Sequence, residues 1–213
     1  MSHFVGLCFG DSWENDLEQY YEGLKVEPYI HCTKEEAIEK AKKHHTENYE
    51  YAVKKLESNT LTSEDRDYYT IVASRGCSLT DEEAWEEVQN WGYKMDDEGN
   101  LLATYNPDSK WDWYSIGGRW SGFLPLKELD SDGNHLTTNE ALVKEIDWEY
   151  LLNEKFPPFC YVDEYGEWFE KGEMGWWGMT TNEEPEDTWK TQFSNYTKEL
   201  DPNCLVTVID FHI

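Results

Sequence analysis

A single arginine stands among closely spaced aromatic residues in WDWYSIGGRW, residues 111–120. A guanidinium can stack on an aromatic ring while its planar fork binds a carboxylate or a phosphate. The segment therefore indicates an aromatic-walled site for a small anion, in which Arg119 binds the charge. The rings and the nearest acid complete the candidate set: Trp111, Trp113, Trp120 and Asp112. The alternative interpretation is a structural ion pair between Arg119 and Asp112 that holds a tryptophan-rich corner together.

Two histidines and a carboxylate near the ends of the chain form a second candidate site. Asp210 and His212 are two positions apart in the alternating segment VTVIDFHI, so they share a face of the strand that this segment predicts. If the first and last strands pair, His3 approaches His212, and the three side chains could act as a catalytic acid–base pair or hold a metal. Their spacing matches no metal motif, so we expect no metal and no cofactor. The alternative is that polar residues simply emerge into water at the chain ends.

Several familiar catalytic motifs are missing from the sequence. It contains no phosphate loop, no GxGxxG after a predicted strand, no GxSxG elbow and no HExxH pair. The sequence therefore favours a protein that binds over one that catalyses, and leaves catalysis at the terminal histidines open.

The charge of the chain limits its partners. Its 45 acidic and 18 basic residues give a formal net charge of −27. Such a surface repels nucleic-acid backbones and anionic membranes, because binding phosphates requires clustered Lys and Arg. It attracts basic surfaces, including those of proteins that themselves bind nucleic acid. The plainer interpretation is that the charge only keeps the protein in solution.

The cysteines and the start of the chain indicate a cytoplasmic protein. Five widely spaced cysteines without a CxxC pair are typical of buried thiols in a reducing compartment. The first residues lack the basic start of a signal peptide. No apolar run approaches the roughly 20 residues that cross a bilayer.

Periodicity and capping signals predict the elements that position these residues. Alternation predicts strands over residues 3–10, 24–32 and 204–213, and puts Trp111 and Trp113 on the same side as Ser115. Capping boxes predict helices that start after Thr33, Thr80 and Thr137, the last of them running to Lys155. Further signals predict helices over residues 63–76 and 185–200, and hairpins over residues 92–105 and 159–172.

This order of elements predicts an α+β fold. We expect a mainly antiparallel sheet that contains both terminal strands as neighbours, with the helices grouped around it. Because the chain shows no linker, repeat or low-complexity tract, we expect a single domain over residues 1–213.

Two stretches, YNPDSKWDWYSIGGRWSGF and LVTVIDFHI, resemble a family of uncharacterised bacterial and phage proteins. EPYI and EGNLLATYNP are also similar, so the resemblance covers most of the chain. It implies a phage or mobile-element setting and no particular activity.

Two functions are compatible with these features. The first is a phage-type acidic binding protein that blocks a basic nucleic-acid-handling or defence protein of the host, without binding nucleic acid or a membrane itself. The second is a protein that binds or hydrolyses a small anionic, nucleotide-like ligand in an aromatic pocket around Arg119, with His3 or His212 transferring the proton.

Overall fold

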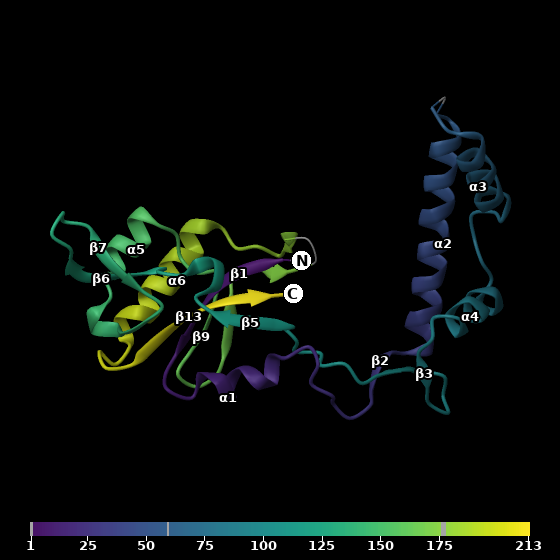
Figure 1. Ribbon diagram of the computed structural model, residues 1–213. Coiled ribbons are helices and arrows are strands. Elements are labelled where there is room, and N and C mark those ends of the chain that lie inside the picture. Colours follow the sequence, from purple (N-terminus) through teal and green to yellow (C-terminus); the bar gives the residue numbers. More distant parts are fainter. Residues whose placement is uncertain (1, 59, 176–177) are drawn as a thin grey trace. The chain divides into compact units, whose positions relative to one another are not determined.

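The computed structural model describes residues 2–58, 60–175 and 178–213. Its contacts divide the chain into two compact units (Figure 1): unit 1 comprises residues 1–25 and 105–213, and unit 2 comprises residues 26–104. Unit 2 is thus an insertion in the sequence of unit 1. Neither junction carries a linker-like run of Gly, Pro or Ser, so this division has no compositional signal in the sequence. The single domain expected over residues 1–213 stays a prediction.

A mainly antiparallel sheet with the order β10-β9-β1-β13-β5 forms the centre of unit 1, and β8 also pairs with β13. Its strands are β1 (His3–Phe9), β5 (Trp113–Ile116), β8 (Glu140–Leu142), β9 (Cys160–Val162), β10 (Trp168–Glu170) and β13 (Leu205–His212). β1 and β13 are antiparallel neighbours along their length, from the pair His3 and His212 to the pair Phe9 and Val206. Only the β1–β9 pair in this sheet is parallel among the described strands. The predicted α+β class and the pairing of the terminal strands are both confirmed.

The sheet separates two hydrophobic cores. On one face Val5, Leu7 and Phe9 of β1 pack with buried residues of α5 (Trp148–Glu154) and α6 (Glu186–Glu199). On the other face Phe4 and Cys8 pack with residues of α1 (Trp13–Leu17). The two helices therefore cover one side of the sheet and α1 covers the other (Figure 1).

Short elements complete unit 1. They are the 3-10 helices η1 (Glu18–Tyr20), η2 (Gly118–Trp120) and η3 (Val143–Glu145), the pair β6 (Leu124–Leu129) and β7 (His135–Thr138), and the pair β11 (Glu173–Met174) and β12 (Thr180–Thr181). The helix expected from Thr137 to Lys155 is wrong over its first half. Residues 135–138 pair with β6 and residues 140–142 pair with β13, while the helix begins at Trp148 behind an Asp147 cap. Pairing with the preceding strand β6 and with the distant strand β13 outweighed the local capping signal at Thr137.

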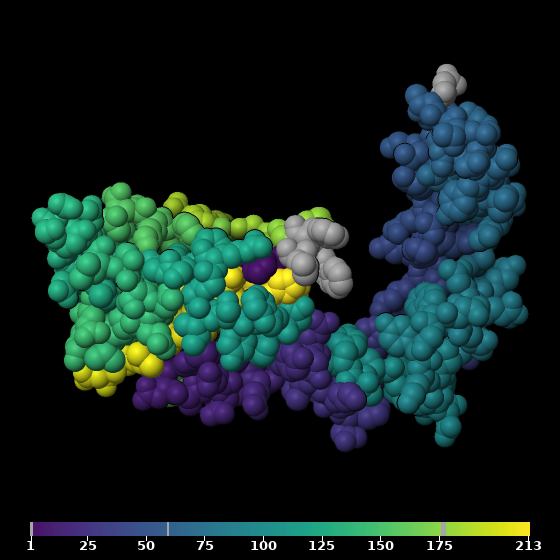
Figure 2. Space-filling view, in the orientation of Figure 1, coloured from purple at the N-terminus to yellow at the C-terminus, as the bar shows by residue number. Residues whose placement is uncertain are grey.

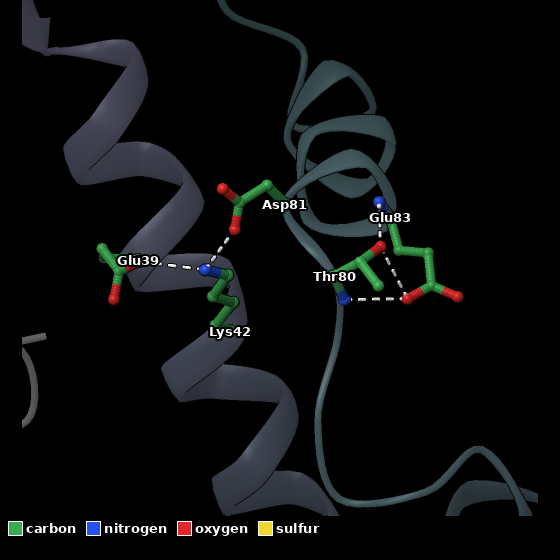
Figure 3. A network of polar contacts seen from close by, with 5 residues as sticks. All are labelled: Glu39, Lys42, Thr80, Asp81 and Glu83. Carbon is green, nitrogen blue, oxygen red and sulfur yellow. Dashed lines mark hydrogen bonds and ion pairs between the residues drawn. The ribbon is translucent and has the colours of Figure 1, made fainter.

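Unit 2 consists of three helices and a three-stranded sheet. The helices are α2 (Lys34–Leu56), α3 (Ser63–Ser74) and α4 (Asp81–Gln89), and the sheet has the order β2 (Tyr29–Cys32), β4 (Leu101–Ala103), β3 (Lys94–Met95). Two of the three predicted capping boxes are confirmed, and both lie in unit 2, at Thr33 with Glu36 and at Thr80 with Glu83. Lys42 of α2 forms ion pairs with Glu39 and with Asp81 at the start of α4, which joins the two helices (Figure 3).

One turn design closes three hairpins. Asp96, Asp130 and Asp163 each accept backbone N–H bonds from the residues two and four positions later. In each turn the residue three positions after the aspartate is a glycine with a φ between 83° and 88°. The spacing Asp-x-x-Gly is therefore sufficient to locate the turns, because a side-chain acceptor and a left-handed glycine close the loop locally.

The described cysteines are free thiols, of which Cys8, Cys32 and Cys160 are buried. Burial raises the pKa of Cys8 and Cys160, which keeps both thiols protonated and unreactive. In the part of the chain that the structure describes, no helix has the length and apolar composition needed to cross a bilayer.

Tyr161 generates a prediction about alkaline stability. Its ring lies in the core, stacked on Phe169 and Tyr196, and burial raises its pKa from 10.0 to about 12. The unfolded chain loses this phenolic proton near pH 10 and the folded chain retains it, so the stabilisation is complete below pH 10 and is lost as pH rises towards 12. We expect Tyr161→Phe to flatten the fall of unfolding free energy with pH in this window, measured by urea unfolding.

The control for this prediction is Tyr165→Phe, because the Tyr165 side chain is 82% exposed. That variant should keep the wild-type pH dependence. Equal slopes in all three proteins would contradict the assignment to Tyr161.

Candidate functional site

The pairing of the terminal strands brings His3, Asp210 and His212 together, as the sequence predicted. His3 lies directly opposite His212, and the ring centroids are 4.9 Å apart. The Nδ1 atom of His3 lies 3.0 Å from Oδ1 of Asp210. In Figure 2 the first residues (purple) and the last residues (yellow) meet at the surface of unit 1. The three residues therefore form one cluster, and its catalytic role stays a prediction.

Asp112 supplies the second carboxylate of this cluster. Its Oδ1 atom lies 2.5 Å from Nδ1 of His212. Each imidazole is therefore held at Nδ1 by one aspartate, and Nε2 of neither ring is hydrogen-bonded among the described residues. An aspartate in this position fixes the orientation of the ring.

The glycine pair of WDWYSIGGRW forms a turn that packs closely against the buried carboxylate of Asp210. This residue is 2% exposed, and its Oδ2 atom accepts the backbone N–H of Arg119 at 2.9 Å. Gly118 has a φ of 49°, and a Cβ atom there would collide with the Asp210 carboxylate and with Ser115. The turn therefore needs glycine at position 118 for two reasons, the left-handed backbone and the close approach of Asp210.

Arg119 contributes to this cluster through its backbone. Its side chain is exposed and forms no ion pair with any residue that the structure describes. The expected ion pair between Arg119 and Asp112 is therefore wrong, because Asp112 is engaged by His212 instead. Anion binding by the exposed guanidinium stays a prediction.

The three tryptophans of the segment lie in different surroundings. Trp113 is 53% exposed and makes edge contacts with His3 and His212, at centroid distances of 6.4 and 6.1 Å. Trp111 instead packs with the core on the other face of the sheet and donates its indole N–H to Leu17 O. The prediction that both lie on one side is wrong, because β5 begins at Trp113 and its alternation does not extend back to Trp111.

Trp120 lines a separate cavity. It packs edge-on against Phe156, and the cavity of about 350 Å³ beside it is also lined by His3 and Phe159. Lys171 also lines this cavity, but its ammonium is already paired with Glu183 and Glu186. The cavity thus places one Asp-oriented imidazole beside four aromatic rings, of Phe4, Trp120, Phe156 and Phe159.

This arrangement can bind or exchange protons. Two imidazoles, each oriented by a carboxylate, are side chains of the type that general acid–base catalysis uses most often. No set of three or more His, Cys, Asp and Glu side chains is placed to hold a metal ion within residues 2–58, 60–175 and 178–213.

The structure also contains a groove in unit 1 that the sequence analysis missed. It has a volume of about 510 Å³ and lies between the segment after β1 and the start of WDWYSIGGRW; its lining residues are Glu14, Asn15, Glu18, Tyr21, Leu24, Trp111 and Tyr114. We call it the acidic aromatic groove. One part of the groove has a signal in the sequence. In the segment WENDLEQYY three acidic residues lie close to Trp13 and Leu17, and two tyrosines follow them.

The turn over Asp210 generates a stability prediction. Gly118→Ala should lower the free energy of unfolding by about 3 kcal/mol, because a left-handed alanine is strained and its Cβ collides with a buried carboxylate. Gly133→Ala is the matched control, since Gly133 has a φ of 84° and nothing lies within 4 Å of its added Cβ. That variant should lose only about 1 kcal/mol. Equal losses in urea unfolding would show that the contact with Asp210 contributes nothing.

No family model matches this chain, and no curated protein and no solved structure is detectably similar to it. The comparisons therefore leave the resemblance to bacterial and phage proteins as a prediction.

Proposed function

We propose that this protein is an acidic binding protein that occupies the basic surface of a partner protein. The observation that carries the proposal is the number of carboxylates without a cation beside them. Among the described residues, ten of the 45 acidic side chains take part in an ion pair. Unit 1 alone holds 27 acidic and nine basic residues. The charge is thus largely available to a partner.

The physical consequence is attraction to clustered Lys and Arg. Unpaired carboxylates produce a negative potential that accelerates encounter with a basic surface and repels nucleic acid. The basic surfaces that fit such a field best are those that bind phosphate backbones. We therefore propose as partner a nucleic-acid-handling or defence protein of a host, met in the cytoplasm and in a phage-related setting. A ligand of this kind competes with nucleic acid for the same face of the partner.

Two basic proteins of equal net charge test this proposal, one that binds DNA and one that has no nucleic-acid site. We expect the DNA-binding protein to form a one-to-one complex at low salt that a DNA duplex displaces. Its affinity should fall at least tenfold when the screening length shortens from about 10 Å at 0.1 M salt to about 3 Å at 1 M. Calorimetric titration measures both effects.

The comparison protein should bind more weakly at every salt concentration. Affinity for the DNA-binding protein that stays flat with salt would remove the electrostatic basis of the proposal. Equal binding to both proteins would show attraction without recognition, and would also count against it.

A second candidate function is supported by the oriented imidazoles. His3 is held by Asp210 and lines a cavity of about 350 Å³, and the exposed Arg119 follows Gly118 in the turn over the same carboxylate. We propose that this region binds a small anionic ligand, such as a nucleotide, with His3 or His212 available for proton transfer.

A thermal-shift series tests this second candidate. Nucleotides and sugar phosphates that bind the folded state should raise the melting temperature of the wild type, since binding stabilises by mass action. The shift should disappear in Arg119→Ala and in His3→Ala, and should persist in Lys127→Ala, which removes an exposed cation elsewhere in unit 1. A shift that survives in all three variants would place the ligand at another site.

A further inference from the structure

The acidic aromatic groove has walls that are fixed in place. Tyr21 and Trp111 lie with ring centroids 4.8 Å apart, and Trp111 meets Tyr114 edge-on at 5.1 Å. The indole of Trp111 is anchored by its N–H bond to Leu17 O, 3.2 Å long. Its backbone carbonyl also accepts the N–H of Glu22 at 2.8 Å. A ligand entering the groove therefore meets rings that are already ordered, which lowers the entropic cost of binding.

The rim of the groove carries two carboxylates. Glu14 belongs to α1 and Glu18 follows it by one helical turn, so both project from the same side of this segment. Both side chains line the groove, are exposed, and form no ion pair with the residues that the structure describes. Glu14 and Tyr114 line the same groove. Burial raises the pKa of Tyr114, and the negative charge of Glu14 raises it further.

The ordered rings and the two carboxylates together favour a ligand of a particular charge and shape. Ring faces carry negative potential and attract cations, and the two carboxylates add full negative charges beside them. An anion or a neutral apolar group would gain nothing from Glu14 and Glu18. A guanidinium is planar, so it can lie against a ring and direct two N–H groups to a carboxylate at the same time. Ammonium groups are more strongly hydrated and offer no flat face.

We propose that the acidic aromatic groove receives an arginine side chain of the basic partner, as the anchor of the complex. This inference rests on the proposed function, because it assigns a specific contact to a surface whose overall charge provides the attraction. It makes Glu14, Glu18 and Trp111 the specificity-determining residues.

The test compares two variants of the full chain that remove the same charge. Glu14→Gln with Glu18→Gln alters the groove, while Glu128→Gln with Glu199→Gln removes two exposed carboxylates from β6 and α6. The probes are two peptides of eight residues each, oligoarginine and oligolysine. We expect wild type to bind oligoarginine more tightly than oligolysine. The groove variant should lose about tenfold or more in oligoarginine affinity and most of this preference, whereas the control variant should lose less than threefold and keep it.

An independent readout is the indole N–H signal of Trp111 in ¹H–¹⁵N spectra, assigned with Trp111→Phe. Oligoarginine should shift this signal in wild type and in the control variant, and leave it in place in the groove variant. Equal affinity losses in the two charge variants, or an unmoved Trp111 signal in wild type, would overturn the groove as the anchor. Neither result would contradict salt-sensitive binding of the whole protein to a DNA-binding partner. The groove as anchor and the proposed binding function can therefore fail separately.

Discussion

The antiparallel pairing of β1 with β13 is the contact on which the rest of unit 1 depends. It joins residues near the two ends of the chain, from His3 opposite His212 to Phe9 opposite Val206. The strands that flank this pair attach to it, β9 to β1 and β5 with β8 to β13. Both cores form on its two faces. Pairing these strands closes nearly the whole chain into one loop, which has a cost in conformational entropy. The contacts that form around the pair must offset this cost.

The same pairing places a charged group where an apolar one would be expected. Asp210 lies between Val208 and His212 on a face that is otherwise core, and it is 2% exposed. A buried carboxylate is tolerated only when its oxygens are hydrogen-bonded. The Nδ1 atom of His3 lies within hydrogen-bonding distance of one oxygen, and the backbone N–H of Arg119 donates to the other. The glycine at position 118 of WDWYSIGGRW is thus explained by the close approach of Asp210, whereas the tryptophans of the segment lie in different surroundings.

The features that could be predicted from the sequence are those that a few neighbouring residues determine. The capping boxes at Thr33 and Thr80 and the Asp-x-x-Gly turns close within five residues, so their signals are complete in the sequence. The terminal strands were found because their alternation is strong and both are apolar. The meeting of His3 with His212 then followed from one assumption about strand pairing.

The features that were missed depend on residues far apart in the chain. Thr137 begins a sequence that fits a capping box, but residues 135–138 pair with the preceding strand β6 and residues 140–142 pair with the distant strand β13. Alternation suggested one side for Trp111 and Trp113, yet a bridge between Trp111 and Tyr21 ends the regular strand. The acidic aromatic groove combines residues 14–24 with residues 111–114, and no local pattern connects these segments.

Unit 2 begins and ends at neighbouring points. The N–H of Val26 donates to the carbonyl oxygen of Thr104 at 3.4 Å, so the first and last residues of the insertion lie side by side. An inserted segment whose ends lie side by side can connect two neighbouring points of the surrounding domain, as a short surface loop does. The described strands of the β1–β13 sheet all come from outside residues 26–104. Shortening or replacing residues 26–104 would therefore remove none of the described strands of that sheet.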